Sequence, residues 1–160
     1  MYRTGIGFDA HRFSGEKKLI LGGVEIPFEL GLEGHSDADV LTHAICDALL
    51  GAVGERDIGS HFPDKDPKYK GISSLVLLKE TLAVLSSKGF NVENIDSVVV
   101  CENPKLQPYI SRIKKSLVSI IDVPEEFLGI KATTTDGVGF TGRGEGIAAY
   151  AVVLVKKINI

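Results

Sequence analysis

Side chains that bind metal ions are concentrated in the first quarter of the sequence. Asp9 and His11 stand two residues apart, and a strand at this point would project both side chains from the same face. His43 would add a third ligand from a separate element. Two histidines and one carboxylate with an open coordination position are typical of catalytic zinc, whereas structural zinc sites are usually closed and richer in cysteine. These three residues are the first candidates for chemistry.

His43 falls within a segment of helical periodicity. Asp39, His43 and Asp47 are spaced four residues apart and therefore share one face of the predicted helix. A polar stripe of this kind is usually only solvated. If His43 binds a metal, however, the carboxylate of Asp47 or Asp39 could orient its imidazole by accepting a hydrogen bond from the ring nitrogen that does not bind the metal.

The loop at residues 57–67 is rich in carboxylates and turn-forming residues. It could be an ordinary surface loop. It could also be a mobile wall that hydrogen-bonds a polyol, with Asp57 accepting from hydroxyl groups and Phe62 acting as a lid. The composition leaves both interpretations open. His61 is expected to be exposed and without a role.

A glycine-rich segment follows the run of threonines at residues 133–135. Its five glycines lie at positions 137, 139, 142, 144 and 146. Such a backbone can approach a phosphate closely, and threonine hydroxyls can donate to its oxygens. The segment is not a Walker loop, because no Gly-Lys-Ser/Thr ending is present. Arg143 and Glu145 would either pair with each other or meet a partner subunit.

Composition sets the class of protein. The 160 residues, 44% hydrophobic and 24% charged, predict one globular domain over residues 1–160. A net charge of −3 and the absence of long basic runs argue against nucleic acid. Cys46 and Cys101 lack metal-binding spacing, so buried free thiols are expected. No window approaches the roughly 20 apolar residues of a membrane span, and we expect a cytoplasmic protein.

The periodicity predicts elements that would carry these residues. Helices are expected at residues 39–53, 72–88 and 109–121, and strands at 2–10, 19–21, 24–26, 96–101, 128–133 and 147–156. The glycines at positions 22 and 23 would form the turn of a hairpin. This order predicts the α+β fold class, with a mixed sheet layered by helices on one face.

The motifs taken together resemble one family, the 2-C-methyl-D-erythritol 2,4-cyclodiphosphate synthases of non-mevalonate isoprenoid biosynthesis. The resemblance covers nearly the whole chain. Its pieces are residues 7–13, 34–39, 57–59, 62–64, 104–106, 131–135 and 139–146, which read GFDAHRF, GHSDAD, DIG, FPD, PKL, KATTT and GFTGRGEG. Each piece is short, but their combination in this order is highly specific.

The resemblance implies an assembly and a reaction. It implies a homotrimer with active sites between subunits, zinc on Asp9, His11 and His43, and a second divalent ion, magnesium or manganese. The implied lyase converts 4-diphosphocytidyl-2-C-methyl-D-erythritol 2-phosphate to the 2,4-cyclodiphosphate and releases CMP. Asp136 stands where the family usually has a glutamate ligand of the second ion. Its side chain is one methylene shorter, so direct coordination stays open.

The resemblance also implies residue roles. The erythritol phosphate site would contain His35, Ser36, Asp57, Gly59 and Asp64, with Phe62 beside it. The cytidine diphosphate site would contain Lys105, Ala132, Thr133 and Thr134, of which Lys105 and Thr134 would be catalytic. The trimer axis, where family members can hold an isoprenoid-like ligand, would be faced by Phe8, Phe140, Arg143 and Glu145.

Two alternatives remain for the function. The metal triad and the polar loop alone would also allow a zinc-dependent phosphohydrolase. The second alternative is a non-enzymatic trimer that binds isoprenyl phosphates through Arg143 and in which zinc is structural. The synthase is favoured by the motif set, and the residues agree with its chemistry because a phosphate nucleophile is already ionised at neutral pH. Such an enzyme needs positioned cations and backbone donors rather than a catalytic serine or a strong base.

Overall fold

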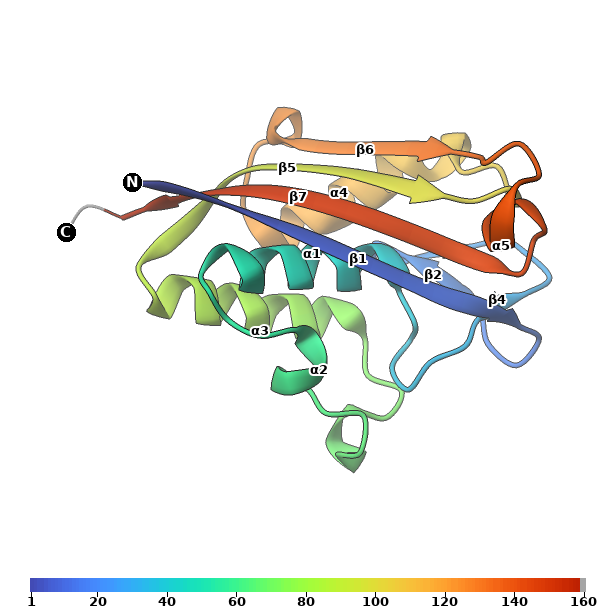
Figure 1. Ribbon diagram of the computed structural model, residues 1–160, viewed down its shortest axis with the longest axis horizontal. Coiled ribbons are helices and arrows are strands. Elements are labelled where there is room, and N and C mark those ends of the chain that lie inside the picture. Colours follow the sequence, from blue (N-terminus) through green and yellow to red (C-terminus); the bar gives the residue numbers. More distant parts are fainter. Residues whose placement is uncertain (159–160) are drawn as a thin grey trace.

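A five-stranded mixed sheet forms the framework of the protein (Figure 1). The computed structural model describes residues 1–158. The strand order is β4-β1-β7-β5-β6, and only β5 and β6 run parallel. The bounds are β1 Tyr2–Ser14, β4 Gly31–Leu32, β5 Phe90–Val100, β6 Leu128–Thr133 and β7 Gly146–Lys157. A separate hairpin pairs β2 Leu19–Leu21 with β3 Val24–Ile26.

The long helices cover one face of this sheet, as predicted (Figure 1). They are α1 Val40–Ala52, α3 Ser74–Ser87 and α4 Ile110–Ile121. Short helical turns interrupt the connections at α2 Ile58–His61, η1 Pro67–Tyr69, η2 Gln107–Tyr109, η3 Glu125–Phe127 and α5 Gly139–Gly142. Helix α1 contacts β1 and β7 most extensively, while α3 packs on β5 and α4 on β6.

The expected elements are confirmed, with three differences at their ends and in the loops. Strand β1 continues to Ser14, because its last two residues pair with β4, which was not predicted. Strand β5 begins at Phe90 rather than residue 96, since the early residues pair with the far end of β7 across a bulge. The segments predicted as loops at residues 54–71 and 137–146 contain α2, η1 and α5. These single turns are too short to give a periodic pattern.

Alternation along the strands separates a core face from an open face. On β7, Ala149, Ala151 and Val153 are fully buried under the helices, while Tyr150 and Val152 between them are exposed. Both cysteines are free and buried, as expected. No helix within residues 1–158 has the length and apolar character to cross a bilayer.

Helix α1 lies directly on the backbone of β1. A Cβ atom added at Gly7 would come within 1.9 Å of the carbonyl oxygen of Ala44, and one added at Gly5 would come within 1.9 Å of that of Ala48. Small residues on both elements therefore allow a close approach of strand and helix. The same strand face continues to Asp9 and His11, so this contact sets the height of the helix above both side chains.

Replacing Gly7 by alanine should therefore destabilise the fold. The added methyl group cannot be accommodated without moving α1, and we expect a loss of about 3 kcal/mol in the free energy of unfolding. Urea titration at matched protein concentration measures this loss. Gly15→Ala is the control, because no atom lies within 4 Å of a Cβ at that position. Equal stability of the two variants would contradict the close-packing argument.

Candidate functional site

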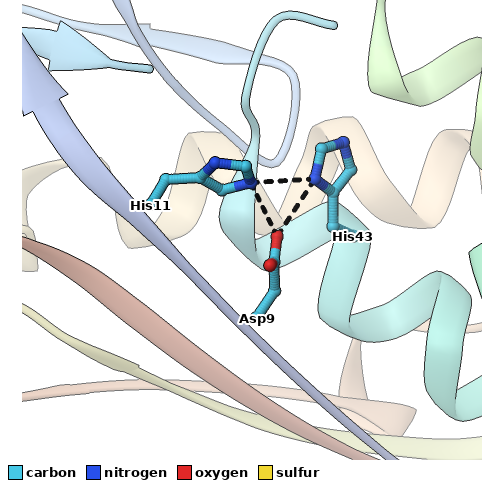
Figure 2. A group of neighbouring side chains, drawn as sticks. All are labelled: Asp9, His11 and His43. Atoms are coloured by element: carbon cyan, nitrogen blue, oxygen red, sulfur yellow. Dashed lines mark hydrogen bonds and ion pairs between the residues drawn. The ribbon is translucent and has the colours of Figure 1, made fainter. Parts of the chain in front are cut away.

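The three candidate metal ligands meet above the sheet (Figure 2). Asp9 and His11 extend from β1, and His43 extends from the first turn of α1. One carboxylate oxygen, Oδ2 of Asp9, lies 2.8 Å from Nε2 of His11 and 3.1 Å from Nδ1 of His43. The two imidazole nitrogens are 3.3 Å apart. The predicted triad is thus assembled from two elements that are distant in sequence.

Backbone contacts fix the tautomer of His11. Its Nδ1 lies 2.7 Å from the carbonyl oxygen of Glu33. Because a carbonyl can only accept, Nδ1 carries the proton in the neutral ring, which leaves the lone pair of Nε2 available to a metal ion. This is the arrangement that a metal-ligating histidine requires. Without a metal ion, burial lowers the pKa of His11, but the hydrogen bond and charge of Asp9 outweigh it and raise the pKa.

Two serine hydroxyls fix the opposite tautomer of His43. Its Nε2 lies 2.8 Å from Oγ of Ser74 and 3.1 Å from Oγ of Ser36. Ser74 Oγ donates to the Asp37 carboxylate, and Ser36 Oγ accepts from the backbone N–H of Ala38. Nε2–H of His43 therefore donates to the hydroxyls, and Nδ1 turns its lone pair toward the triad. Ser74 was missed in the sequence, because it lies 31 residues beyond His43.

The converging lone pairs suit a cation. With both histidines neutral, two nitrogens and a carboxylate oxygen face one another without a proton between the nitrogens. Burial raises the pKa of Asp9, but hydrogen bonds and charges from His11 and His43, which require protons on the facing nitrogens in place of a metal ion, outweigh it and lower the pKa to about 2. The carboxylate is therefore ionised. The donor set of two imidazoles and one carboxylate fits a zinc ion with an open position.

The predicted orienting role of Asp39 and Asp47 is wrong. Asp39 caps α1 by accepting from the N–H of Thr42, and it also accepts from the backbone N–H groups of Gly22 and Gly23. Asp47 accepts from the N–H of Ile58 at 2.7 Å. Both carboxylates are thus engaged by backbone donors of neighbouring segments, and serine hydroxyls contact the imidazole instead. Helix α1 is also buried around most of its surface rather than solvated along this stripe.

A pocket of about 260 Å³ opens beside the triad. It brings together the metal ligands and the predicted substrate residues His35, Ser36, Asp57, Gly59, Phe62 and Asp64, and its wall also includes Gly34, Asp47, Ile58, Tyr69 and Leu77. His35 Nε2 is buried and has no hydrogen-bond partner among the described residues. A buried polar atom without a partner is unusual, so His35 is suited to meet a polar ligand in this pocket.

The loop at residues 57–67 forms one wall of the pocket. Asp57 caps α2 by accepting from the N–H and the hydroxyl of Ser60. Phe62 is buried and packs edge-on against Tyr69, so it forms part of the wall rather than a free lid. His61 is not exposed as predicted. It is half-buried and pairs with Glu55 at 3.2 Å, a contact that the sequence pattern did not indicate.

The residues assigned to the cytidine diphosphate lie in a second cluster, outside this pocket. They are Lys105, Ala132, Thr133 and Thr134, near the adjacent ends of the parallel strands β5 and β6. Glu102 holds this cluster together. Its carboxylate accepts from the N–H groups of Thr135 and Gly137, and its carbonyl oxygen accepts from Lys105 Nζ. Sequence reasoning did not single out Glu102.

Asp136 lies in the turn that Glu102 holds. Its backbone φ is 51°, and one of its carboxylate oxygens lies 3.3 Å from the hydroxyl of Thr134. The side chain is exposed. Farther along, Arg143 pairs with Glu145 at 2.9 Å, which is the intrachain alternative foreseen for these residues. Phe140, in α5, is exposed.

Comparison with known proteins identifies the family. The model of the YgbB family matches residues 2–156. The chain belongs to the YgbB family. Curated relatives named 2-C-methyl-D-erythritol 2,4-cyclodiphosphate synthase include those of Syntrophus aciditrophicus (57% identical; 97% of this chain, 98% of the relative) and Caldicellulosiruptor bescii (57%; 97% and 99%). The resemblance seen in the motifs is confirmed, and with it the enzyme class, a lyase that forms a cyclic diphosphate.

Solved structures of YgbB-type proteins share the fold. The bifunctional IspDF of Campylobacter jejuni superposes with a TM-score of 0.95 at 40% identity, over 99% of this chain and 43% of that chain. A 2C-methyl-D-erythritol-2,4-cyclodiphosphate synthase described as a CDP-bound form superposes with a TM-score of 0.89 at 35% identity, over 96% of this chain and 100% of that chain.

Removing the Ser74 hydroxyl should weaken metal binding. Ser74→Ala leaves Nε2–H of His43 with one hydroxyl partner in place of two, and we expect zinc affinity to fall roughly tenfold. Competition with a chromophoric chelator measures the affinity. Ser87→Ala, at the other end of α3, is the matched control, because its hydroxyl only contacts Val84 of its own helix. Unchanged affinity in Ser74→Ala would exclude this orienting contact.

Proposed function

We propose that the protein converts 4-diphosphocytidyl-2-C-methyl-D-erythritol 2-phosphate to 2-C-methyl-D-erythritol 2,4-cyclodiphosphate and CMP. Membership of the YgbB family supports this reaction. The observation that carries it is the pocket lined by Asp9, His11, His43 and the half-buried His35, whose Nε2 is buried and has no hydrogen-bond partner among the described residues. This arrangement suits a phosphate that must be held and partly neutralised.

The proposed reaction needs no nucleophile from the protein. An oxygen of the 2-phosphate attacks the β-phosphorus, and the bond from that phosphorus to the oxygen bridging the α-phosphate breaks, so that CMP leaves. When bound, zinc held by Asp9, His11 and His43 supplies Lewis-acid neutralisation of phosphate charge. His35 and Ser36 hold the 2-phosphate. The hydroxyl groups of the polyol form hydrogen bonds with Asp57, with the backbone of Gly59 and with Asp64.

The leaving group is assigned to the second cluster. Lys105 stabilises the charge that develops on the diphosphate, and the Thr134 hydroxyl donates to it. Ala132 and Thr133 complete the cytidine side. Asp136, beside the Thr134 hydroxyl, would hold the second ion, magnesium or manganese, which would neutralise charge on the diphosphate. CDP complexes of solved relatives support a cytidine nucleotide as the ligand.

A homotrimer would bring the two clusters together. Within one chain, Lys105 and Thr134 do not line the pocket of the triad, so a neighbouring subunit is the proposed source of the cytidine half. The open face of the sheet offers an apolar surface for association: Ile6 is 71% exposed, Phe8 49%, Tyr150 44% and Val152 49%. Large exposed apolar side chains grouped on one face are typical of a protein interface.

The trimer would also surround a central cavity. Phe8, Phe140, Arg143 and Glu145 are proposed to face its axis, where an isoprenoid-like ligand could bind. In the alternative of a pure isoprenyl phosphate module, the ligand would have to compete with Glu145 for the guanidinium of Arg143.

Phosphorus NMR of the purified protein with substrate, zinc and magnesium tests the reaction. We expect coupled cyclic diphosphate resonances to appear together with CMP, because the attacking phosphate belongs to the same molecule as the β-phosphorus. Removing metal with a chelator should abolish both signals, and adding zinc and magnesium should restore them. CMP with an open-chain bisphosphate would instead support the phosphohydrolase. Unchanged substrate with a folded, zinc-loaded protein would support the binding module.

Mixed oligomers test the shared site. His43→Ala and Lys105→Ala subunits should each be inactive, but coexpression should restore roughly a quarter of wild-type activity, because random mixing in a ring of three regenerates about one intact site in four. A mixture of His43→Ala and His11→Ala is the control, since both changes damage the same half. Absence of recovery in the first mixture would place both halves of the site in one chain.

A further inference from the structure

Lys17 reaches the pocket wall from outside. It lies in the turn between β1 and β2, and its ammonium donates to the backbone carbonyl oxygens of Gly34 and Ser36, the latter at 2.9 Å. The residue is not part of the pocket lining and belongs to none of the motifs singled out in the sequence. Its two acceptors flank His35, the residue with the unpartnered buried nitrogen.

The segment at residues 34–36 is held from two sides. The carbonyl oxygen of His35, between the two acceptors of Lys17, accepts from the N–H of Gly71 at 2.8 Å. The segment is therefore clamped by Lys17 on one side and by the start of the α3 connection on the other.

Apart from these bonds to its carbonyl oxygens, the segment is held by the Ser36 hydroxyl, which contacts Nε2 of His43 and the N–H of Ala38. Strand β4 ends at Leu32 and α1 begins at Val40, so residues 34–36 belong to neither a ladder nor a helix. Gly34 lies against the metal ligand His11, since a Cβ added there would come within 3.2 Å of its ring. Charge-assisted hydrogen bonds are the stronger class, and Lys17 directs two of them at this short segment.

We propose that Lys17 is a positioning residue for the phosphate-binding half of the site. Its ammonium fixes the backbone on both sides of His35 and thereby aims the imidazole nitrogen at the substrate phosphate. Lys17 acts through the segment and does not touch the substrate. The inference rests on the proposed function, because it assigns the erythritol phosphate to His35 and Ser36.

The adjacent lysine provides a matched control. Lys18 has the same charge and stem, but its ammonium pairs with Glu25 on the exposed side of the hairpin, at 3.1 Å. Lys18→Met therefore removes one positive charge from the same turn without touching the segment at residues 34–36. Any effect of net charge or of the turn itself should appear equally in both variants.

Calorimetric binding of two ligands to the zinc-loaded protein tests the proposal. Lys17→Met should weaken binding of 2-C-methyl-D-erythritol 2-phosphate roughly tenfold, as expected for loss of hydrogen bonds from a charged donor. Binding of CDP should stay unchanged, because its residues lie in the other cluster. Lys17→Arg, which keeps a charged donor, should recover most of the affinity, and Lys18→Met should match wild type.

Hydrogen exchange provides a readout without substrate. In Lys17→Met, the amides of Asp37 and Gly71, which are bonded to Ile72 and His35, should exchange faster than in wild type or Lys18→Met. Unchanged affinity and exchange in Lys17→Met would overturn the proposal, and so would equal weakening of both ligands. Failure of the wild-type protein to bind either ligand would instead overturn the proposed function.

Discussion

The contact between helix α1 and strand β1 is the constraint on which the site depends. Glycines at positions 5 and 7 let the helix rest on the strand backbone. Farther along β1, the same strand face carries Asp9 and His11. His43 contacts both side chains from the first turn of α1 (Figure 2). The interatomic distances of the triad are thus set by packing of the rigid core, which is how a metal site gains its precision.

Hydrogen bonds around the triad orient the two histidine rings that the core packing brings together. His11 donates to a backbone carbonyl, and His43 donates to two hydroxyls. In its neutral form, each ring therefore has an unprotonated nitrogen facing the triad. The hydroxyl of Ser74 also links His43 to Asp37 and to the start of α3. Metal binding, the wall at residues 34–36 and the seating of α3 consequently share one hydrogen-bond network, and a change at any of them should affect the others.

An acidic protein can bind a highly anionic substrate if positively charged side chains or metal ions lie at the binding site itself. With a net charge of −3, the chain has no overall attraction for phosphate. Lys105 lies in one cluster, and the candidate metal triad lies in the other. The proposed joining of these clusters between subunits would place positive charge on opposite sides of the β-phosphorus and the attacking 2-phosphate. Association and catalysis would then depend on the same apolar face of the sheet.

The sequence alone predicted most of the fold and the three residues of the candidate metal site. Periodicity was sufficient for the long helices and the regular strands, because each buries one face and repeats accordingly. The strand spacing of Asp9 and His11 was sufficient to place them together. The motif set also predicted the family, which fixed the residues of the pocket, since six of them do line it.

Other features were decided only by the tertiary structure. Asp39 and Asp47 have the spacing of orienting carboxylates, yet backbone N–H groups from other segments occupy both. Ser74, Glu102 and Lys17 carry no sequence signal, because each acts on a segment that is adjacent only in space. Hydrogen bonds depend on distance and direction between groups that the fold brings together. Side-chain types and local spacing determine which groups are available, and only packing determines which of them meet.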